Sequence, residues 1–217
     1  MAYVRMALLN PFANPLIAST YEAWYQTAGR RADRQEKALL KRLLNGFPTA
    51  HSILDAGCGT GHFTRWYGEQ GLRAVGLDLS RPMLEEAKGL RNPPCLQGDA
   101  LALPFRSASL DLVALITTLE FLPDPVQALV EALRVARQGL LLGVLNAQSR
   151  LGQKYKREGG PIWETAHFFT PHELERVVQQ VTDKKPKVIW QTTLWPFWPG
   201  ALPLPWGGFI GMAVKLS

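Results

Sequence analysis

The chain has 217 residues, 47% of them hydrophobic and 19% charged, and a formal net charge of +6. This length and balance suit one well-buried α/β domain, so we expect a single domain over residues 1–217. No apolar run reaches the ~18 to 20 residues of a membrane span, and the first residues lack the apolar core and cleavage site of a signal peptide. We therefore expect a cytoplasmic protein without a membrane span.

The excess of lysine and arginine over acidic residues, with a pI near 9.5, raises the question of an acidic partner such as RNA. The lysines and arginines are scattered, however, and the two densest groups, residues 30–42 and 184–187, have the spacing of solvated helix faces. Nucleic acid is therefore not the expected partner. The two cysteines, Cys58 and Cys95, lack metal-ligand spacing with each other or with a histidine, so we expect reduced structural thiols and no metal.

Residues 15–44 have apolar positions at helical spacing, and the chain breaks at Gly46-Phe47-Pro48. Within this stretch Tyr21, Trp24 and Tyr25 cluster on one side. Two roles stay open for these aromatic residues, because they suit either anchoring of the helix to a sheet or closure over a ligand.

The stretch 53–63, ILDAGCGTGHF, organises the rest of the chain. An apolar run ends at Asp55, glycines follow at Gly57, Gly59 and Gly61, and a helical pattern comes next, so the stretch reads as strand, tight turn and helix. A second apolar run ends at Asp78 about twenty residues later, a spacing that places an acceptor beside ribose hydroxyls in a doubly wound sheet. Together they predict a nucleoside-binding site.

A dinucleotide-binding dehydrogenase would carry G-x-G-x-x-G, whereas here the third glycine follows the second by two positions and an acid precedes the first. In this respect residues 55–61 resemble the first motif of the class I S-adenosylmethionine-dependent methyltransferases. The resemblance implies a doubly wound, mostly parallel seven-stranded sheet of the Rossmann-like methyltransferase fold, with an antiparallel last strand. It also implies an N-terminal helical lid over residues 1–47, a cofactor-binding core over 48–146, and a substrate-side segment with the last strands over 147–217.

The resemblance continues after the next two strands, which we expect at residues 72–78 and 94–98. Ser80 is a candidate helix N-cap with Pro82 in the first turn, and D-x-S-x-x-M-L follows the ribose-binding acid in many family members. Two roles stay open for Met83, which suits packing against the adenine or a place in the core. In GDALALPF the family's equivalent of Asp99 accepts a hydrogen bond from the adenine amino group, and the amide of Ala100 contacts the ring.

Residues 110–116 form a near-continuous apolar run that predicts a buried parallel strand. Ligands in such sheets lie beyond the carboxyl ends of the strands, so residues 117–120 are expected to line the site. A helix from Pro125 to about Gln138 and a fifth strand over 139–145 follow, with residues 137–139 in the turn between them. The implied cofactor-binding residues are Tyr21, Asp55, Gly57, Cys58, Gly59, Gly61, Asp78, Leu79, Met83, Asp99, Ala100, Ile116 and Thr117.

A basic, glycine-containing loop is expected over residues 152–161, followed by a helix that Thr170 caps, with Pro171 at its first position and Glu173 in a capping box. Two residues are candidates for a catalytic base, Glu120 and His167. Many relatives carry histidine where Glu120 stands, and either side chain also fits a purely structural role.

The last two strands are expected at residues 187–194 and 208–216, with the segment Trp195–Trp206, WPFWPGALPLPW, between them. A loop this long and apolar is unusual. It suits contact with a partner, a lipid surface or an apolar substrate if it is exposed, or coverage of the sheet edge if it folds back.

The sequence thus favours an S-adenosylmethionine-dependent methyltransferase that acts on a small-molecule acceptor by in-line displacement. Two alternatives remain at this point: an RNA or protein methyltransferase, and a non-catalytic S-adenosylmethionine-binding protein that acts through the tryptophan-rich segment or the basic face. The acceptor pocket of this fold is built from variable segments, so the acceptor itself cannot be read from the chain.

Overall fold

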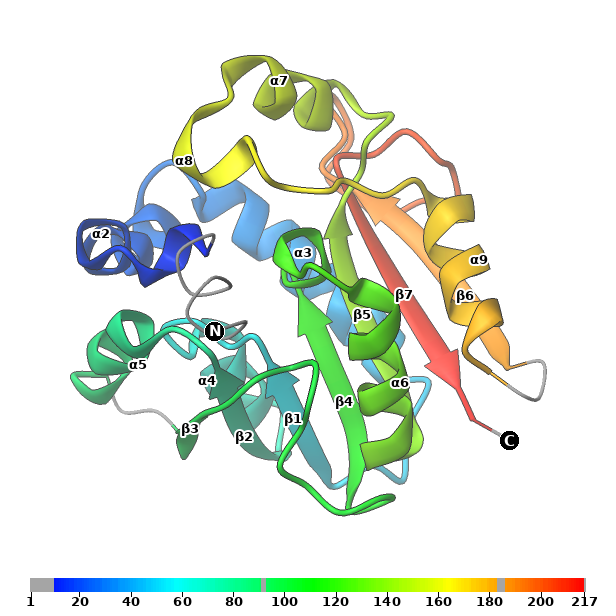
Figure 1. Ribbon diagram of the computed structural model, residues 1–217. Coiled ribbons are helices and arrows are strands. Elements are labelled where there is room, and N and C mark those ends of the chain that lie inside the picture. The colour runs from blue at the N-terminus through cyan, green and yellow to red at the C-terminus, as the bar shows by residue number, and fades with distance from the viewer. Residues whose placement is uncertain (1–9, 91–92, 183–185, 217) are drawn as a thin grey trace.

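A seven-stranded sheet forms the centre of the computed structural model, which describes residues 10–90, 93–182 and 186–216 (Figure 1). The strand order is β3-β2-β1-β4-β5-β7-β6, and the neighbouring pairs are parallel except for those that β7 makes with β5 and β6. The expected doubly wound sheet with an antiparallel last strand is confirmed. Residues 1–9 of the expected lid and Lys184 and Lys185 of one basic group lie outside the described residues.

The N-terminal helical stretch is divided, whereas the sequence predicted one continuous pattern. After a short 3₁₀ turn, η1 (Pro11–Ala13), come α2 (Pro15–Gln26) and α3 (Arg30–Leu44). At the junction a Cβ on Gly29 would lie 2.2 Å from the Trp24 ring, so the tryptophan folds over a position that only glycine can occupy. The break therefore depends on a local contact that helical periodicity does not register.

The first half of the sheet follows the predicted order. β1 (Ser52–Ala56) leads through the glycine turn into α4 (His62–Glu69), and β2 (Arg73–Asp78) leads into α5 (Arg81–Lys88). Ser80 caps α5 by accepting a hydrogen bond from the Met83 amide, as predicted. The edge strand β3 (Cys95–Gln97) is short.

The second half departs from the prediction at one junction. β4 (Leu110–Ile116) runs into a 3₁₀ turn, η2 (Leu119–Phe121), and then into α6 (Pro125–Val135). β5 (Ala136–Leu145) begins immediately, so residues 137–139, expected in a turn, belong to the strand. Arg137 pairs there with Asp111 of the neighbouring β4 at 3.0 Å, a contact between residues that are distant in sequence.

The segment after β5 was expected as a loop, and this was wrong. Residues Arg150–Glu158 form the helix α7, capped by the Ser149 side chain, and Gly160–Trp163 form α8. Gly152 is required inside α7, because a Cβ there would lie 2.1 Å from the Asn146 carbonyl oxygen. The capping box of α9 (Pro171–Gln180) is formed as predicted, and β6 (Lys187–Thr193) and β7 (Phe209–Lys215) complete the sheet.

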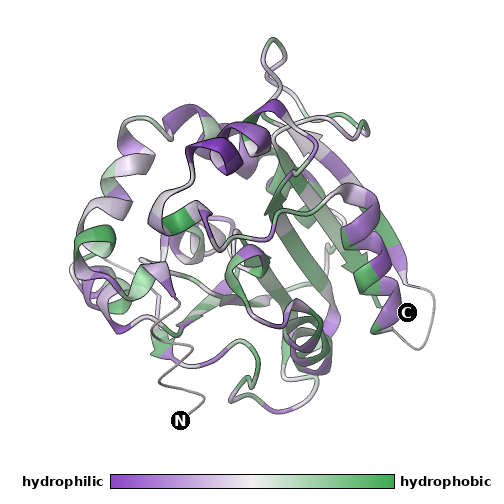
Figure 2. Ribbon diagram, turned by 45° about the horizontal axis from the view of Figure 1, so that its top comes forward, coloured by the Kyte–Doolittle hydropathy of each residue, from purple (hydrophilic) through white to green (hydrophobic). Residues whose placement is uncertain are grey.

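Helices cover both faces of the sheet. On one face α3 and α4 pack through leucine and aromatic side chains onto β1, β4, β5 and β7, and on the other α6 and α9 pack onto the same strands. Figure 2 shows the central strands as hydrophobic and the outer helices with hydrophilic surfaces. No helix within the described residues is long and apolar enough to cross a bilayer.

Candidate functional site

A cavity of about 280 Å³ opens at the carboxyl ends of β1, β2 and β4, where ligands bind in doubly wound sheets. Its volume is close to the lower end of the ~300–1,000 Å³ typical of small-molecule pockets. Of the predicted cofactor-binding residues, all except Gly61 line it: Tyr21, Asp55, Gly57, Cys58, Gly59, Asp78, Leu79, Met83, Asp99, Ala100, Ile116 and Thr117. Sequence motifs spread over about a hundred residues therefore converge on one cavity.

At the glycine turn the cavity is lined by backbone that carries no side chains at Gly57 and Gly59. Gly57, Gly59 and Gly61 all have positive φ, between 55° and 80°. A Cβ on Gly57 would lie 2.3 Å from the Thr118 side chain, so that glycine allows close packing against the end of β4. A Cβ on Gly59 would have its nearest neighbour 3.6 Å away, at Met83, and would instead occupy space at the cavity wall. Gly61 does not line the cavity and instead is the N-cap residue at which α4 begins.

Asp78, at the end of β2, holds the glycine turn in place. Its Oδ2 accepts a hydrogen bond from the Gly59 amide at 2.7 Å, and its Oδ1 accepts one from the Ser80 amide at 2.7 Å. Burial raises the pKa of Asp78, and these amides oppose the shift. Since an ionised carboxylate has about four acceptor positions, acceptor capacity remains for hydroxyl groups in the cavity.

The other two acids occupy different environments. Asp55 is almost fully buried, and its Oδ2 accepts a hydrogen bond from the Thr64 hydroxyl at 2.6 Å, which joins β1 to α4. Burial raises the pKa of Asp55 to about 7 despite this bond. Asp99 lies beyond β3, where its Oδ1 accepts a hydrogen bond from the Leu101 amide at 2.8 Å and leaves acceptor capacity at the cavity.

Backbone strain marks the end of β4. Thr117 has a φ of +48°, a left-handed conformation that costs a β-branched residue about 1–3 kcal/mol. Its amide donates to the Gly143 carbonyl at 2.7 Å, and its hydroxyl donates to the Ile116 carbonyl at 2.8 Å. The strained residue lines the cavity next to Thr118, whose side chain packs against Gly57 of the glycine turn.

An aromatic wall, which sequence reasoning found only in part, closes the other side of the cavity. Phe12 makes edge-to-face contacts with Tyr21 and with Phe121, whose ring centroids lie 5.7 and 4.9 Å away. Phe121 in turn contacts Trp163 of α8, which stacks on Tyr155 of α7 at 4.4 Å. The wall therefore extends from the N-terminal helices to the segment after β5.

The main feature that sequence reasoning missed is a polar network around His62. Its Nε2 lies 2.7 Å from Asp33 of α3, its Nδ1 lies 3.3 Å from Glu22 of α2, and its ring stacks on Tyr25 at 3.5 Å. Glu22 also pairs with Arg65 and accepts a hydrogen bond from the Thr60 hydroxyl. The network ties both N-terminal helices to the start of α4. Its members are far apart in sequence, so no spacing pattern reveals it.

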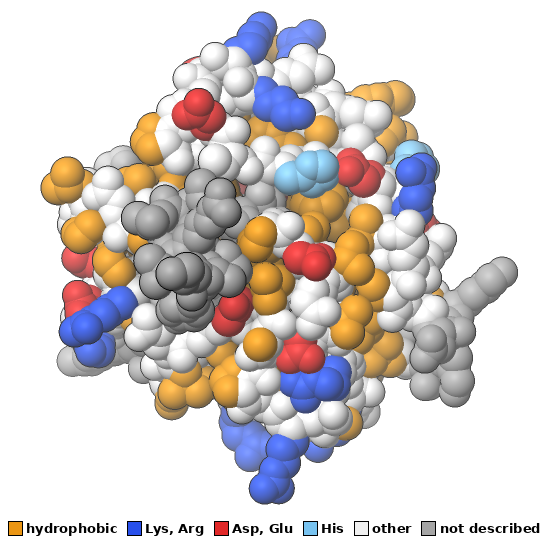
Figure 3. Space-filling view, viewed as in Figure 1, with side chains coloured by type: hydrophobic (Ala, Val, Ile, Leu, Met, Phe, Trp, Pro, Cys, Tyr) orange, Lys and Arg blue, Asp and Glu red, His pale blue; other side chains and the backbone are white. Residues whose placement is uncertain are grey.

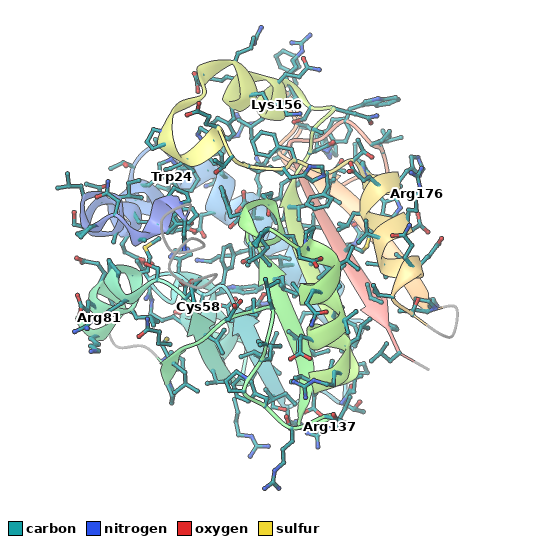
Figure 4. The ribbon with its side chains drawn as sticks, viewed as in Figure 1. Trp24, Cys58, Arg81, Arg137, Lys156 and Arg176 are labelled. Atoms are coloured by element: carbon teal, nitrogen blue, oxygen red, sulfur yellow. The ribbon has the colours of Figure 1, made fainter. Side chains whose placement is uncertain are left out.

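Tyr21 and Tyr25 thus combine the two roles left open above, because both line the cavity while Tyr25 also anchors its helix through His62. Trp24, by contrast, does not line the cavity and is 38% exposed. Labels for Trp24 and Cys58 in Figure 4 locate α2 and the glycine turn on facing sides of this region.

The two candidate bases do not reach the cavity. Glu120 is 1% exposed and turns inward, where its Oε1 accepts a hydrogen bond from the Leu145 amide at 2.7 Å and its Oε2 has no partner. Burial raises the pKa of Glu120 to about 8. His167 is on the surface, paired with Glu173 at 2.9 Å. The expectation that residues 117–120 line the site therefore fails for Leu119 and Glu120, because η2 turns their side chains into the core.

The two cysteine thiols converge beneath the glycine turn. A Cβ on Gly76 of β2 would lie 2.7 Å from the sulfur of Cys58 and 2.9 Å from that of Cys95. Both residues are free cysteines, and Cys58 is buried. The space over Gly76 is thus filled by sulfur.

Gly76→Ala should destabilise the fold by about 1–3 kcal/mol, because the added methyl group overpacks the two sulfurs. Gly68→Ala is the matched control: it lies in the last turn of α4 and its Cβ would meet nothing closer than 3.8 Å, so we expect no loss of stability. Urea denaturation of both variants provides the measurement. Equal free energies of unfolding for the two variants would show that the two sulfurs move aside for the added methyl group at little cost.

Comparison with known proteins agrees with this geometry. Residues 54–142 match the family described as "Methyltransferase domain". The malonyl-[acyl-carrier protein] O-methyltransferase of Erwinia billingiae is 40% identical over 100 residues, or 45% of this chain and 40% of that protein. The demethylmenaquinone methyltransferase of Lactococcus lactis is 40% identical over 110 residues, or 46% of this chain and 42% of that protein. The chain spans about half the length of the curated relatives it matches.

One similar solved structure extends over almost the whole chain. A protein from Thermotoga maritima, described as a SAM-dependent methyltransferase and possible histamine N-methyltransferase, superposes with a TM-score of 0.77 at 27% identity. The match covers 94% of this chain and 97% of that one. The similarity therefore includes the N-terminal helices and the last strands as well as the motif-bearing half.

Proposed function

Because the chain belongs to the class I S-adenosylmethionine-dependent methyltransferases, we propose that it transfers a methyl group to a small-molecule acceptor. S-adenosylmethionine is the cofactor of this family. The observation that carries the proposal is the single cavity in which the strained end of β4 and the acids after β2 and β3 surround the bare-backbone turn.

The donor groups of the cavity fit an adenosine. Asp78 offers acceptors to the ribose hydroxyls, and Asp99 with the Ala100 amide offers an acceptor and a donor to the adenine edge. Met83, which is 2% exposed, packs beside the turn and supplies an apolar surface for the ring. When bound, the cofactor supplies a methyl group activated by the positive charge of its sulfonium.

The polar groups of the cavity favour catalysis by positioning. Among the described lining residues, the ring nitrogens of His62 contact Asp33, Lys37 and Glu22, and Asp55 is almost fully buried and accepts a hydrogen bond from the Thr64 hydroxyl. Burial raises the pKa of Tyr21 to about 12, so its hydroxyl stays neutral and is not suited to remove a proton at neutral pH. We therefore infer an acceptor whose nucleophilic atom is already deprotonated when it binds, such as a carboxylate or a thiolate, and a reaction driven by alignment in a dry pocket.

The relatives support a small acceptor in general terms. Those reported above are named for a malonyl-carrier substrate, a demethylmenaquinone and, for the solved structure, histamine. These acceptors differ in chemical class, so their names support methyl transfer more strongly than any one substrate.

Calorimetric titration with S-adenosylhomocysteine tests cofactor binding, and we expect saturable heat together with a rise in Tm that grows with ligand concentration. Turnover is then tested with methyl-labelled cofactor against matched carboxylate, thiol, phenol and amine acceptors. Label transfer to a carboxylate or thiol is the expected result. Absence of binding at millimolar ligand would refute the proposal, while binding without transfer to any class would favour the non-catalytic alternative.

A further inference from the structure

The segment between β6 and β7 exposes large apolar side chains. Phe197 is 94% exposed, Trp206 60%, Trp198 54% and Leu204 41%. Single exposed apolar residues are ordinary, but four within ten residues form a patch that soluble surfaces usually avoid. Here they lie on irregular backbone, interrupted by prolines, so their exposure does not come from a helix face that awaits a neighbour.

The backbone under this patch is held firmly. The Asn146 side chain donates hydrogen bonds to the carbonyls of Pro205 and Gly207 at 2.6 and 2.8 Å, and Thr192 exchanges two backbone hydrogen bonds with Leu202. At the other end the Arg31 guanidinium donates to the Trp195 carbonyl at 3.1 Å. The aromatic side chains are thus presented by an anchored scaffold.

Helix α7 places positive charge beside the same segment. Its exposed side chains include four cations, Arg150, Lys154, Lys156 and Arg157, and one acid, Glu158. The helix begins against the segment, because a Cβ on Gly208 would lie 3.0 Å from the Leu151 side chain. In Figure 3 basic side chains gather at the top edge over α7 with hydrophobic side chains beside them, and Figure 4 places Lys156 there.

We propose that residues 195–206 and α7 together form a docking surface for an anionic lipid bilayer. Tryptophan and phenylalanine side chains partition into the interfacial region of a bilayer, and nearby lysines and arginines add attraction to acidic headgroups. Charge complementarity favours an acidic bilayer over a second copy of this chain, because that copy would bring its own cations against the same cations. This inference does not depend on methyl transfer.

The docking surface lies at the cavity end of the molecule. Tyr155, on α7 between the cations, stacks on Trp163, which contacts Phe121 of the cavity lining. A bilayer on this surface would therefore face the aromatic wall of the cavity.

The test is sedimentation with vesicles of phosphatidylcholine alone or with 30% phosphatidylglycerol, using the full chain without cofactor. We expect binding to the acidic vesicles that weakens with salt and is absent from the neutral ones. Lys156→Glu with Arg157→Glu should reduce the partition coefficient by about 25-fold or more, since each cation near the surface contributes about fivefold. Phe197→Ala with Trp198→Ala should reduce it by about tenfold, because these rings lose apolar burial in the interface.

Matched controls carry the same changes on other faces: Lys88→Glu with Arg176→Glu for charge, and Val126→Ala with Val130→Ala for apolar area. They should leave the partition coefficient within about twofold of wild type, because exposed cations outside the docking surface contribute little. The proposal is wrong if the wild-type protein does not bind acidic vesicles at low salt. It is also wrong if the Phe197→Ala, Trp198→Ala variant binds them as the wild type does. If instead ultracentrifugation shows a dimer that the aromatic variant dissociates and no vesicle binding, the surface joins two copies and the bilayer is excluded.

Discussion

Replacing Asp78 with alanine is expected to weaken S-adenosylhomocysteine binding by about 100-fold or more. The substitution would remove the acceptor that we propose for the ribose hydroxyls, where each hydrogen bond to a charged acceptor is worth about 1.5–3 kcal/mol, and the amides of Gly59 and Ser80 would lose the acceptor that sets the turn. Titration calorimetry measures the change. Asp78→Asn keeps the size and one acceptor oxygen, so we expect a smaller loss of about tenfold.

Two comparisons make this prediction specific. Glu86→Ala removes an exposed carboxylate from the helix that follows Asp78 and should leave binding unchanged. Glu120→Gln alters a carboxyl group that does not line the cavity and should have a smaller effect than Asp78→Ala. The reverse ranking would contradict the assigned site. Circular dichroism without ligand separates lost binding from lost folding.

The stability of the protein is expected to fall as pH rises from about 5 to 8.5. Burial raises the pKa of Glu36 and of Glu120 from 4.5 to about 8, and that of Asp55 from 3.8 to about 7. The folded state therefore binds more protons than the unfolded state in this interval, so the free energy of unfolding decreases with pH. Well below about pH 4 both states are protonated and well above about pH 8 both are ionised, so these groups add slope only between those limits.

Glu120→Gln should flatten this slope. Each unit of pKa shift corresponds to about 1.4 kcal/mol, so removing the Glu120 titration changes the wild-type-to-variant difference by a few kcal/mol across the window. In Tm that is about 5–10 °C for a domain of this size. Scanning calorimetry at pH 5.5, 7 and 8.5 provides the measurement, with Glu86→Gln as an exposed control. Parallel curves for wild type and Glu120→Gln would show that folding does not shift the pKa of Glu120.

Local sequence rules predicted the parts of the fold that depend on local physics. The run into Asp55, the three glycines, and the caps at Ser80 and Thr170 each act within a few residues, and all are formed as expected. The sheet order and the cofactor cavity followed from these elements together with the family resemblance.

The misses depend on specific contacts, some between distant residues and some within a few residues, that hydrophobic periodicity does not register. β5 begins early, and Arg137 near its start reaches Asp111, 26 residues away in sequence. α7 depends on how Gly152 fits over the Asn146 carbonyl, and the His62 network joins three separate helices. Glu120 was placed correctly at the end of β4, but the turn of η2 decides that its side chain points into the core.

The reversed direction of β7 has a consequence for how such proteins diversify. Because β7 runs antiparallel between β5 and β6, the chain must leave β6 and enter β7 at the same end of the sheet as the cavity. Residues inserted or exchanged in that connection would change the surface at this end of the sheet, while the strands keep their register. The connection can therefore vary without altering the residues that line the cavity.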